Sequence, residues 1–133
     1  AGLREVMDLF TPGTHGSTYG GNPLAAAVTL AALDVLVDEQ LPERAARLGA
    51  HALARLRREV TSQDVREVRG RGLMLAVEYR GPVAKDACKA LLKAGVLAKD
   101  THKTTIRFAP PLVITDEQLD EALDLVIPVL NRF

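Results

Sequence analysis

The chain has 133 residues, of which 47% are hydrophobic and 26% charged, proportions typical of a globular protein large enough to bury a core. Lysine plus arginine and aspartate plus glutamate each number 17, so the net charge of zero gives no general reason to expect nucleic acid or an anionic membrane as partner. No apolar run reaches the roughly 20 residues of a membrane span, because Asp34 interrupts the longest one. Cys88 is the single cysteine and no leader pattern opens the chain, so we expect a cytoplasmic protein without an internal disulfide.

The first part of the chain joins a glycine-rich loop to an apolar helix. Residues 3–10 are expected to form a short helix, and the loop "GTHGSTYGGNP" follows over 13–23. Asn22 and Pro23 are typical of an N-cap and of a first helical residue, which predicts a helix over 23–38. Nearly every face of this helix is apolar, and that pattern predicts burial against another domain or subunit.

A helix and two extended segments are predicted next. Apolar residues recur at helical spacing over 42–60 and form a single stripe. Residues 65–79 read as two extended segments, with Gly70-Arg71-Gly72 as the turn or bulge between them. These segments supply the first half of a helix-and-sheet unit.

The second half repeats this alternation. A helix is expected over 83–94, and the alternating segments 96–100 and 105–109 predict two strands. A capping-box pattern that begins at Thr115 predicts the start of a last helix, whose final turn Pro128 is expected to kink or fray.

The order of these elements predicts the fold class. Helices that alternate with pairs of short strands favour a small α+β domain with its helices on one face of a short sheet. We place a domain boundary near residue 40, between residues 1–40 and 41–133.

The loop concentrates groups that could hold an anion. Its glycines allow close backbone approach to a ligand, and Ser17 and Thr18 add hydroxyl groups. The spacing matches neither the P-loop nor the dinucleotide-binding fingerprint. The residues alone therefore leave two interpretations open, a phosphate site and a tight glycine-rich connection.

Four stretches resemble one enzyme family. "HGSTYGGNPLAAAV", "VREVRGRGLMLAVE", "GVLAKDTH" and "IRFAPPLVIT" agree in order and spacing with the class III (ornithine-type) aminotransferases, which are fold-type I enzymes that use pyridoxal 5'-phosphate. Within this class, "LAKDTH" followed by "IRFAPPLVI" is more similar to the ornithine aminotransferases than to the acetylornithine-using or 4-aminobutyrate-using enzymes. The resemblance covers essentially the whole chain.

The resemblance implies an α/β protein whose active sites are each built by two subunits of a homodimer. Residues 1–40 would be the end of the cofactor-binding large domain, and 41–133 the α+β C-terminal small domain. Ser17 and Thr18 would bind the phosphate of the partner's cofactor, and the helix at 23–38 would lie in the interface. The implied reaction moves the δ-amino group of ornithine to 2-oxoglutarate.

Arg107 is the candidate substrate-binding residue. From the residues alone it could be a surface arginine on an edge strand, although its planar guanidinium suits bidentate binding of a carboxylate. The matching arginine of the resembling family binds a carboxylate of the amino-acid or oxo-acid substrate. In ornithine aminotransferases, a glutamate upstream covers that arginine while ornithine is bound.

Transamination also needs a lysine that forms a Schiff base with the cofactor. None of the five lysines occupies the matching position, which would lie before Ala1. We therefore expect no catalytic residue within the chain, no activity from the chain alone, and a match to the C-terminal third of the enzyme.

Other residues suggest weaker alternatives. A non-catalytic association module would explain the apolar helix without a cofactor, and the arginine-rich stretches raise the possibility of a nucleic-acid surface. Interrupting acidic residues and an aromatic content of 4% disfavour the latter. The scattered histidines have no metal-binding spacing. His15 could contact the cofactor, the interface or the backbone, and Cys88 is expected to be a buried, inert thiol.

Overall fold

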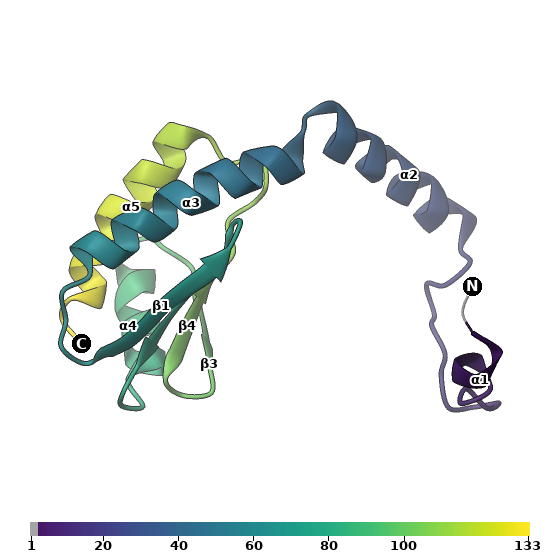
Figure 1. Ribbon diagram of the computed structural model, residues 1–133, viewed down its shortest axis with the longest axis horizontal. Helices are drawn as coiled ribbons and strands as arrows, with labels where there is room; N and C mark the ends of the chain where they lie inside the picture. The colour runs from purple at the N-terminus through teal and green to yellow at the C-terminus, as the bar shows by residue number, and fades with distance from the viewer. Residues whose placement is uncertain (1–2) are drawn as a thin grey trace. The chain divides into compact units, whose positions relative to one another are not determined.

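The computed structural model describes residues 3–133 and divides the chain into two compact units, Ala1–Asp38 and Glu39–Phe133 (Figure 1). The first unit contains α1 (Arg4–Met7) and α2 (Pro23–Asp38), joined by the glycine-rich loop. The side chain of Asn22 caps α2, because its Oδ1 accepts hydrogen bonds from the amides of Leu24 at 2.9 Å and Ala25 at 3.2 Å. The predicted helix start is confirmed.

The surface of α2 is apolar and uncovered within its own unit. None of its residues is buried, and Leu24 and Val37 keep 74% and 75% of their surface exposed. Monomeric proteins rarely expose a contiguous apolar surface of this kind without a partner for it.

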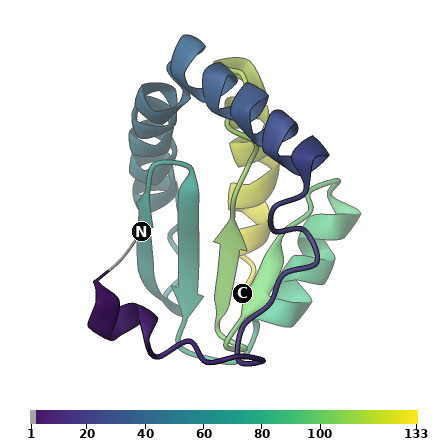
Figure 2. The same ribbon diagram turned by 90° about the vertical axis from the view of Figure 1, so that its right-hand side faces the viewer.

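The second unit combines helices with one antiparallel sheet. Its elements in chain order are α3 (Leu41–Glu59), β1 (Val65–Arg71), β2 (Met74–Tyr79), α4 (Ala84–Lys93), β3 (Lys99–Thr101), β4 (Thr105–Phe108) and α5 (Asp116–Leu130). The strands are ordered β1-β2-β4-β3, so β4 is an inner strand although it comes last. Figure 2 shows α3, α4 and α5 on the same side of this sheet. The predicted fold class is confirmed.

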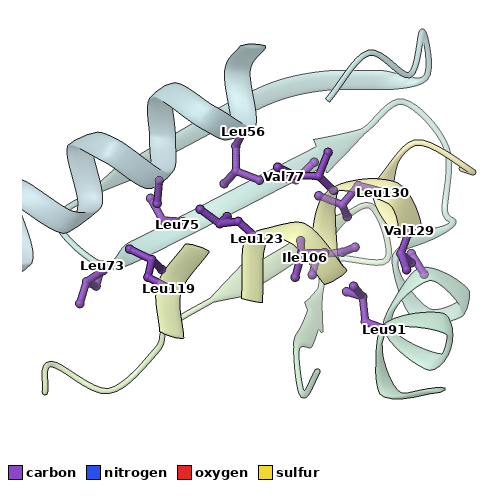
Figure 3. Close-up of a cluster of buried hydrophobic side chains, with 14 of the residues drawn as sticks. Leu56, Leu73, Leu75, Val77, Leu91, Ile106, Leu119, Leu123, Val129 and Leu130 are labelled. Atoms are coloured by element: carbon purple, nitrogen blue, oxygen red, sulfur yellow. The ribbon is translucent and has the colours of Figure 1, made fainter. Parts of the chain in front are cut away.

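The core lies between the sheet and the helices, as Figure 3 shows for a cluster of its side chains. Because side chains alternate along a strand, Leu75 and Val77 point into the core, whereas Ala76 and Glu78 lie on the other face. The hydroxyl of buried Tyr79 donates a hydrogen bond of 3.0 Å to the carbonyl oxygen of Leu130 and so ties β2 to the end of α5. The sheet therefore has one covered face and one face without helices, here called the open face.

A contact between two glycines brings α3 close to the β1–β2 hairpin. A Cβ atom on Gly49 would overlap the carbonyl group of Gly72, which occupies the turn with a φ of 54°. In β1, a Cβ atom on Gly70 would lie only 2.6 Å from Leu75 Cδ2 and 2.7 Å from the carbonyl oxygen of Met74. The Gly-Arg-Gly turn that the sequence predicted is thus shaped by its packing against a helix.

Two expected details differ in the structure. The first strand expected over 96–100 is shorter and shifted, because β3 begins only at Lys99 and Val96 instead donates a hydrogen bond to the carbonyl oxygen of Leu91. The final turn of α5 does not fray, since α5 continues past Pro128 and the amide of Asn131 bonds to Ile127. Burial of Val129 and Leu130 against the core holds this turn in place.

We predict that Gly49→Ala lowers the free energy of unfolding by about 1–3 kcal/mol, because the added methyl group forces the hairpin away from α3. Urea denaturation of the two proteins measures the difference. Gly81→Ala is the matched control, because no atom lies within 4 Å of its added Cβ, and it should change stability by less than about 0.5 kcal/mol. Equal stability of the two variants would contradict the proposed contact.

Candidate functional site

Ser17 and Thr18 in the glycine-rich loop differ in their hydrogen bonding. The Oγ atom of Ser17 accepts a hydrogen bond of 2.9 Å from the amide of Gly20, so this hydroxyl closes a local turn. Within residues 3–133, neither the amide nor the hydroxyl of exposed Thr18 has a hydrogen-bond partner. Thr18 thus offers two free donors on a turn that Ser17 holds.

The backbone beside these donors leaves room for a ligand. Gly13 and Gly21 have φ values of 86° and 79°, a region that glycine adopts readily. No atom lies within 4 Å of a Cβ built on Gly16 or Gly21, so the loop is open on the side of these residues. Free amide and hydroxyl donors in an open glycine-rich turn fit an anionic group such as a phosphate.

His15 is positioned by an aromatic neighbour. Its ring meets the ring of Phe10 edge to face, with centroids 5.5 Å apart and planes at 69°. The sequence did not indicate this aromatic contact, and within residues 3–133 the side chain of His15 forms no hydrogen bond to the backbone, which was one of the alternatives.

Arg107 lies on the open face of the sheet. The alternative of an edge-strand arginine was wrong, because β4 pairs with β2 on one side and with β3 on the other. Arg107 lies opposite Ala76 on β2 and opposite Lys99 on β3. The side chain is exposed and forms no ion pair with any residue of the described part of the chain. Its guanidinium is free to bind a carboxylate.

Arg107 lines an open hollow together with residues that the sequence had not brought together. Arg71 borders it from the end of β1, and His102 borders it from the β3–β4 turn, where His102 and Lys103 have φ values of 51° and 64°. Small Ala76 forms part of the floor. From the sequence, Arg71 belongs to the Gly-Arg-Gly turn and to an arginine-rich stretch. Strand register is what brings it to the same hollow as Arg107.

The other arginines of that stretch are engaged elsewhere. Arg69 contacts Glu67 at 2.8 Å and Glu78 at 2.6 Å, and Arg66 contacts Glu78 at 3.1 Å. The hydrogen bond from Arg69 lowers the pKa of Glu78 and thus favours its ionised form. On α3, the guanidinium of Arg55 binds carboxylates of α3 and α5, namely Glu59, Asp120 and Asp124. Arg55, Arg66 and Arg69 are thus each held by carboxylates.

The remaining candidates do not form a reactive site. Cys88 is partly buried on α4, and burial raises the pKa of its thiol, which favours the unreactive form. In the part of the chain that the structure describes, no group of three or more His, Cys, Asp or Glu residues is placed to hold a metal ion. None of the helices in residues 3–133 has the length and apolarity to cross a membrane.

The chain was compared with known families and curated proteins. The sequence profile "Aminotransferase class-III" matches residues 1–130. The chain belongs to the class-III aminotransferase family. It is 52% identical over 126 residues to an ornithine aminotransferase of Geobacillus sp. (strain WCH70), covering 95% of this chain and 31% of that protein. It is 53% identical over 123 residues to ornithine aminotransferase 2 of Staphylococcus aureus (strain N315), covering 92% of this chain and 31% of that protein.

Solved structures of an ornithine aminotransferase and of an acetylornithine aminotransferase are similar in fold to this chain. An ornithine aminotransferase from Plasmodium yoelii is similar at a TM-score of 0.83 and 44% identity, covering 96% of this chain and 35% of that one. An acetylornithine aminotransferase from Elizabethkingia anophelis is similar at a TM-score of 0.82 and 44% identity, covering 96% and 33%. The present chain therefore spans about a third of the length of these relatives.

Proposed function

We propose that this class-III aminotransferase chain is part of an ornithine–oxo-acid aminotransferase, which moves the δ-amino group of ornithine to 2-oxoglutarate. The main support is its 52–53% identity to ornithine aminotransferases over more than nine-tenths of the chain. We further propose that residues 1–40 are the end of the cofactor-binding large domain and that 41–133 are the C-terminal small domain.

The glycine-rich loop would hold the cofactor by its phosphate. Pyridoxal 5'-phosphate, when bound, supplies the electron-withdrawing ring through which an amino group passes from one substrate to the next. In our proposal, Thr18 donates hydrogen bonds to that phosphate from its amide and hydroxyl, while Ser17 keeps the turn closed and can still donate its own proton. The cofactor served by this loop belongs to the partner subunit.

The apolar helix supports the proposed homodimer. None of the residues of α2 is buried within its own unit, although the helix is rich in leucine, valine and alanine. Burying such a surface against a second subunit removes it from water, and it would place the loop beside the partner's active site. We also propose a cytoplasmic location, with which the absence of a cysteine pair from these 133 residues agrees.

Arg107 would bind a carboxylate of the oxo-acid or amino-acid substrate. A guanidinium presents two parallel N–H donors that match the two oxygens of a carboxylate, and the side chain is free of protein ion pairs within residues 3–133. Its position on an inner strand fixes the backbone from which it extends. This geometry positions the substrate and leaves proton transfer to groups outside the chain.

Use of acetylornithine is the second candidate. The solved acetylornithine aminotransferase is as similar to this chain as an ornithine aminotransferase structure, at 44% identity each. Steady-state assays of the full-length protein with each amino donor separate the two candidates. Turnover with acetylornithine at a higher kcat/KM than with ornithine would reject the first one.

We predict that Thr18→Ala weakens binding of pyridoxal phosphate to the full-length protein by about tenfold or more, because a hydrogen bond to a charged group contributes about 1.5–3 kcal/mol. Titration of the apoprotein with the cofactor, followed by absorbance, measures the change. Thr18→Ser keeps the hydroxyl and should bind nearly as the parent does. Unchanged affinity of Thr18→Ala would instead favour a loop that only connects, as in a non-catalytic association module.

We predict that Arg107→Lys lowers kcat/KM for 2-oxoglutarate by about tenfold or more, since lysine keeps the charge but loses the bidentate fork. Initial rates at varied 2-oxoglutarate concentration measure this loss. Arg132→Lys, near the end of the chain, is the control for a conservative change of a surface arginine. A parent-like kcat/KM in Arg107→Lys would show that Arg107 does not bind the substrate carboxylate.

A further inference from the structure

Charges on the open face are separated into two parts. The first part holds Arg66, Arg69, Glu67 and Glu78, whose charges cancel in a connected set of ion pairs of 2.6–3.1 Å. The second part holds Arg71, Lys99 and Arg107 and is here called the cationic end. Neither Arg71 nor Arg107 forms an ion pair with any of the residues that the structure describes.

Strand register explains why these three cations share one region. Arg107 lies directly opposite Lys99 on β3, and the Cβ atoms of such cross-strand neighbours are about 4.5–5.5 Å apart. On the other side, Arg107 faces Ala76, and Arg71 lies opposite Met74, two residues earlier on the same strand. The residue directly across Ala76 from Arg107 is the ion-paired Arg69. Arg71 lies two residues further along β1, so Arg71 and Arg107 are diagonal neighbours across β2, and both line the hollow.

Little negative charge offsets this end. The only carboxylate paired with it in the described part of the chain is that of Asp100, whose Oδ1 lies 3.4 Å from the Nζ of Lys99. The lining of the hollow contains Arg69, Arg71, Arg107 and His102 but no aspartate or glutamate. Like charges placed opposite one another on a sheet are unfavourable, so this arrangement favours a nearby anion.

The two substrates of the proposed reaction differ in the sign of their charge. At neutral pH, 2-oxoglutarate carries two carboxylates and no ammonium group, whereas ornithine carries two ammonium groups and one carboxylate. A positive field beside the carboxylate-binding Arg107 therefore attracts one substrate and repels the other. Removing one positive charge from this face should therefore weaken the encounter with 2-oxoglutarate and strengthen the encounter with ornithine.

We propose that Arg71, together with Lys99, is a specificity-determining residue that favours the oxo acid over ornithine through the field of the cationic end. This inference rests on the proposed function. It assigns Arg71 no direct contact with the reacting atoms. At a separation of about 10 Å and an effective dielectric constant close to that of water, one charge changes the encounter with a dianion about two- to fivefold.

The test compares kcat/KM for both substrates in the full-length holoenzyme. In Arg71→Gln at an ionic strength of about 0.02 M, kcat/KM for 2-oxoglutarate should fall about two- to fivefold, and that for ornithine should rise by up to about twofold. Both changes should largely disappear at about 0.5 M salt, where screening shortens the reach of the field. Arg71→Lys keeps the charge and should restore both values.

Two further variants keep the test decisive. Lys99→Gln should change the two kcat/KM values in the same directions as Arg71→Gln, so the inference is testable even if one variant fails to fold. Lys93→Gln removes one positive charge from α4 on the helical side of the sheet and should leave their ratio unchanged.

The outcomes separate this inference from the proposed function. If the parent protein does not transfer an amino group from ornithine to 2-oxoglutarate, the proposed function is wrong. If the parent is active but Arg71→Gln and Lys99→Gln leave the ratio of the two kcat/KM values unchanged, or lower both values equally, the field of the cationic end does not set specificity and the inference is overturned.

Discussion

Close packing of Gly49 on α3 against Gly72 in the β1–β2 turn sets the distance between the helical layer and the sheet. A Cβ atom on Gly49 would overlap the carbonyl group of Gly72, whereas Gly72 itself is suited to the turn by its φ of 54°. With the hairpin held against α3, alternation along β2 and β4 puts their apolar side chains on the helical side, where they are buried. The opposite face then receives the polar members of each strand, including Arg107. Helix–hairpin packing and strand alternation together leave Arg107 on the face without helices.

The two candidate binding elements of this class-III aminotransferase chain work by different physical means. The loop around Thr18 offers hydrogen-bond donors that its own turn does not consume, because the neighbouring hydroxyl of Ser17 closes that turn. The sheet offers charge, because Arg107 extends from an inner strand into a region without carboxylates in its lining. A phosphate accepts several directed hydrogen bonds, whereas the two oxygens of a carboxylate are matched by the two parallel donors of one guanidinium.

Pairing of charges is as informative as their number. The chain is neutral in total, yet its arginines fall into groups that are locally cancelled and a group that is not. Arg55 ties α3 to α5 through two carboxylates of α5 and also pairs with Glu59 of its own helix, and Arg69 is held by two carboxylates. On the open face, the pairs of Arg66 and Arg69 with Glu67 and Glu78 cancel these charges locally. On the open face, the charge that these pairs do not cancel lies at the cationic end, next to the proposed substrate site.

The sequence by itself determined the helix starts at Asn22 and Thr115, the alternation of helices with strands, and the family, because these depend on local capping, periodicity and motif spacing. It placed Ser17, Thr18 and Arg107 among the candidates on the strength of a family resemblance. Only the tertiary structure decided that β4 is an inner strand, that β3 begins at Lys99, and that the last turn of α5 survives Pro128. It alone placed Arg71 beside Arg107, because strand order and register arise from contacts between residues far apart in the chain, and local patterns do not encode them.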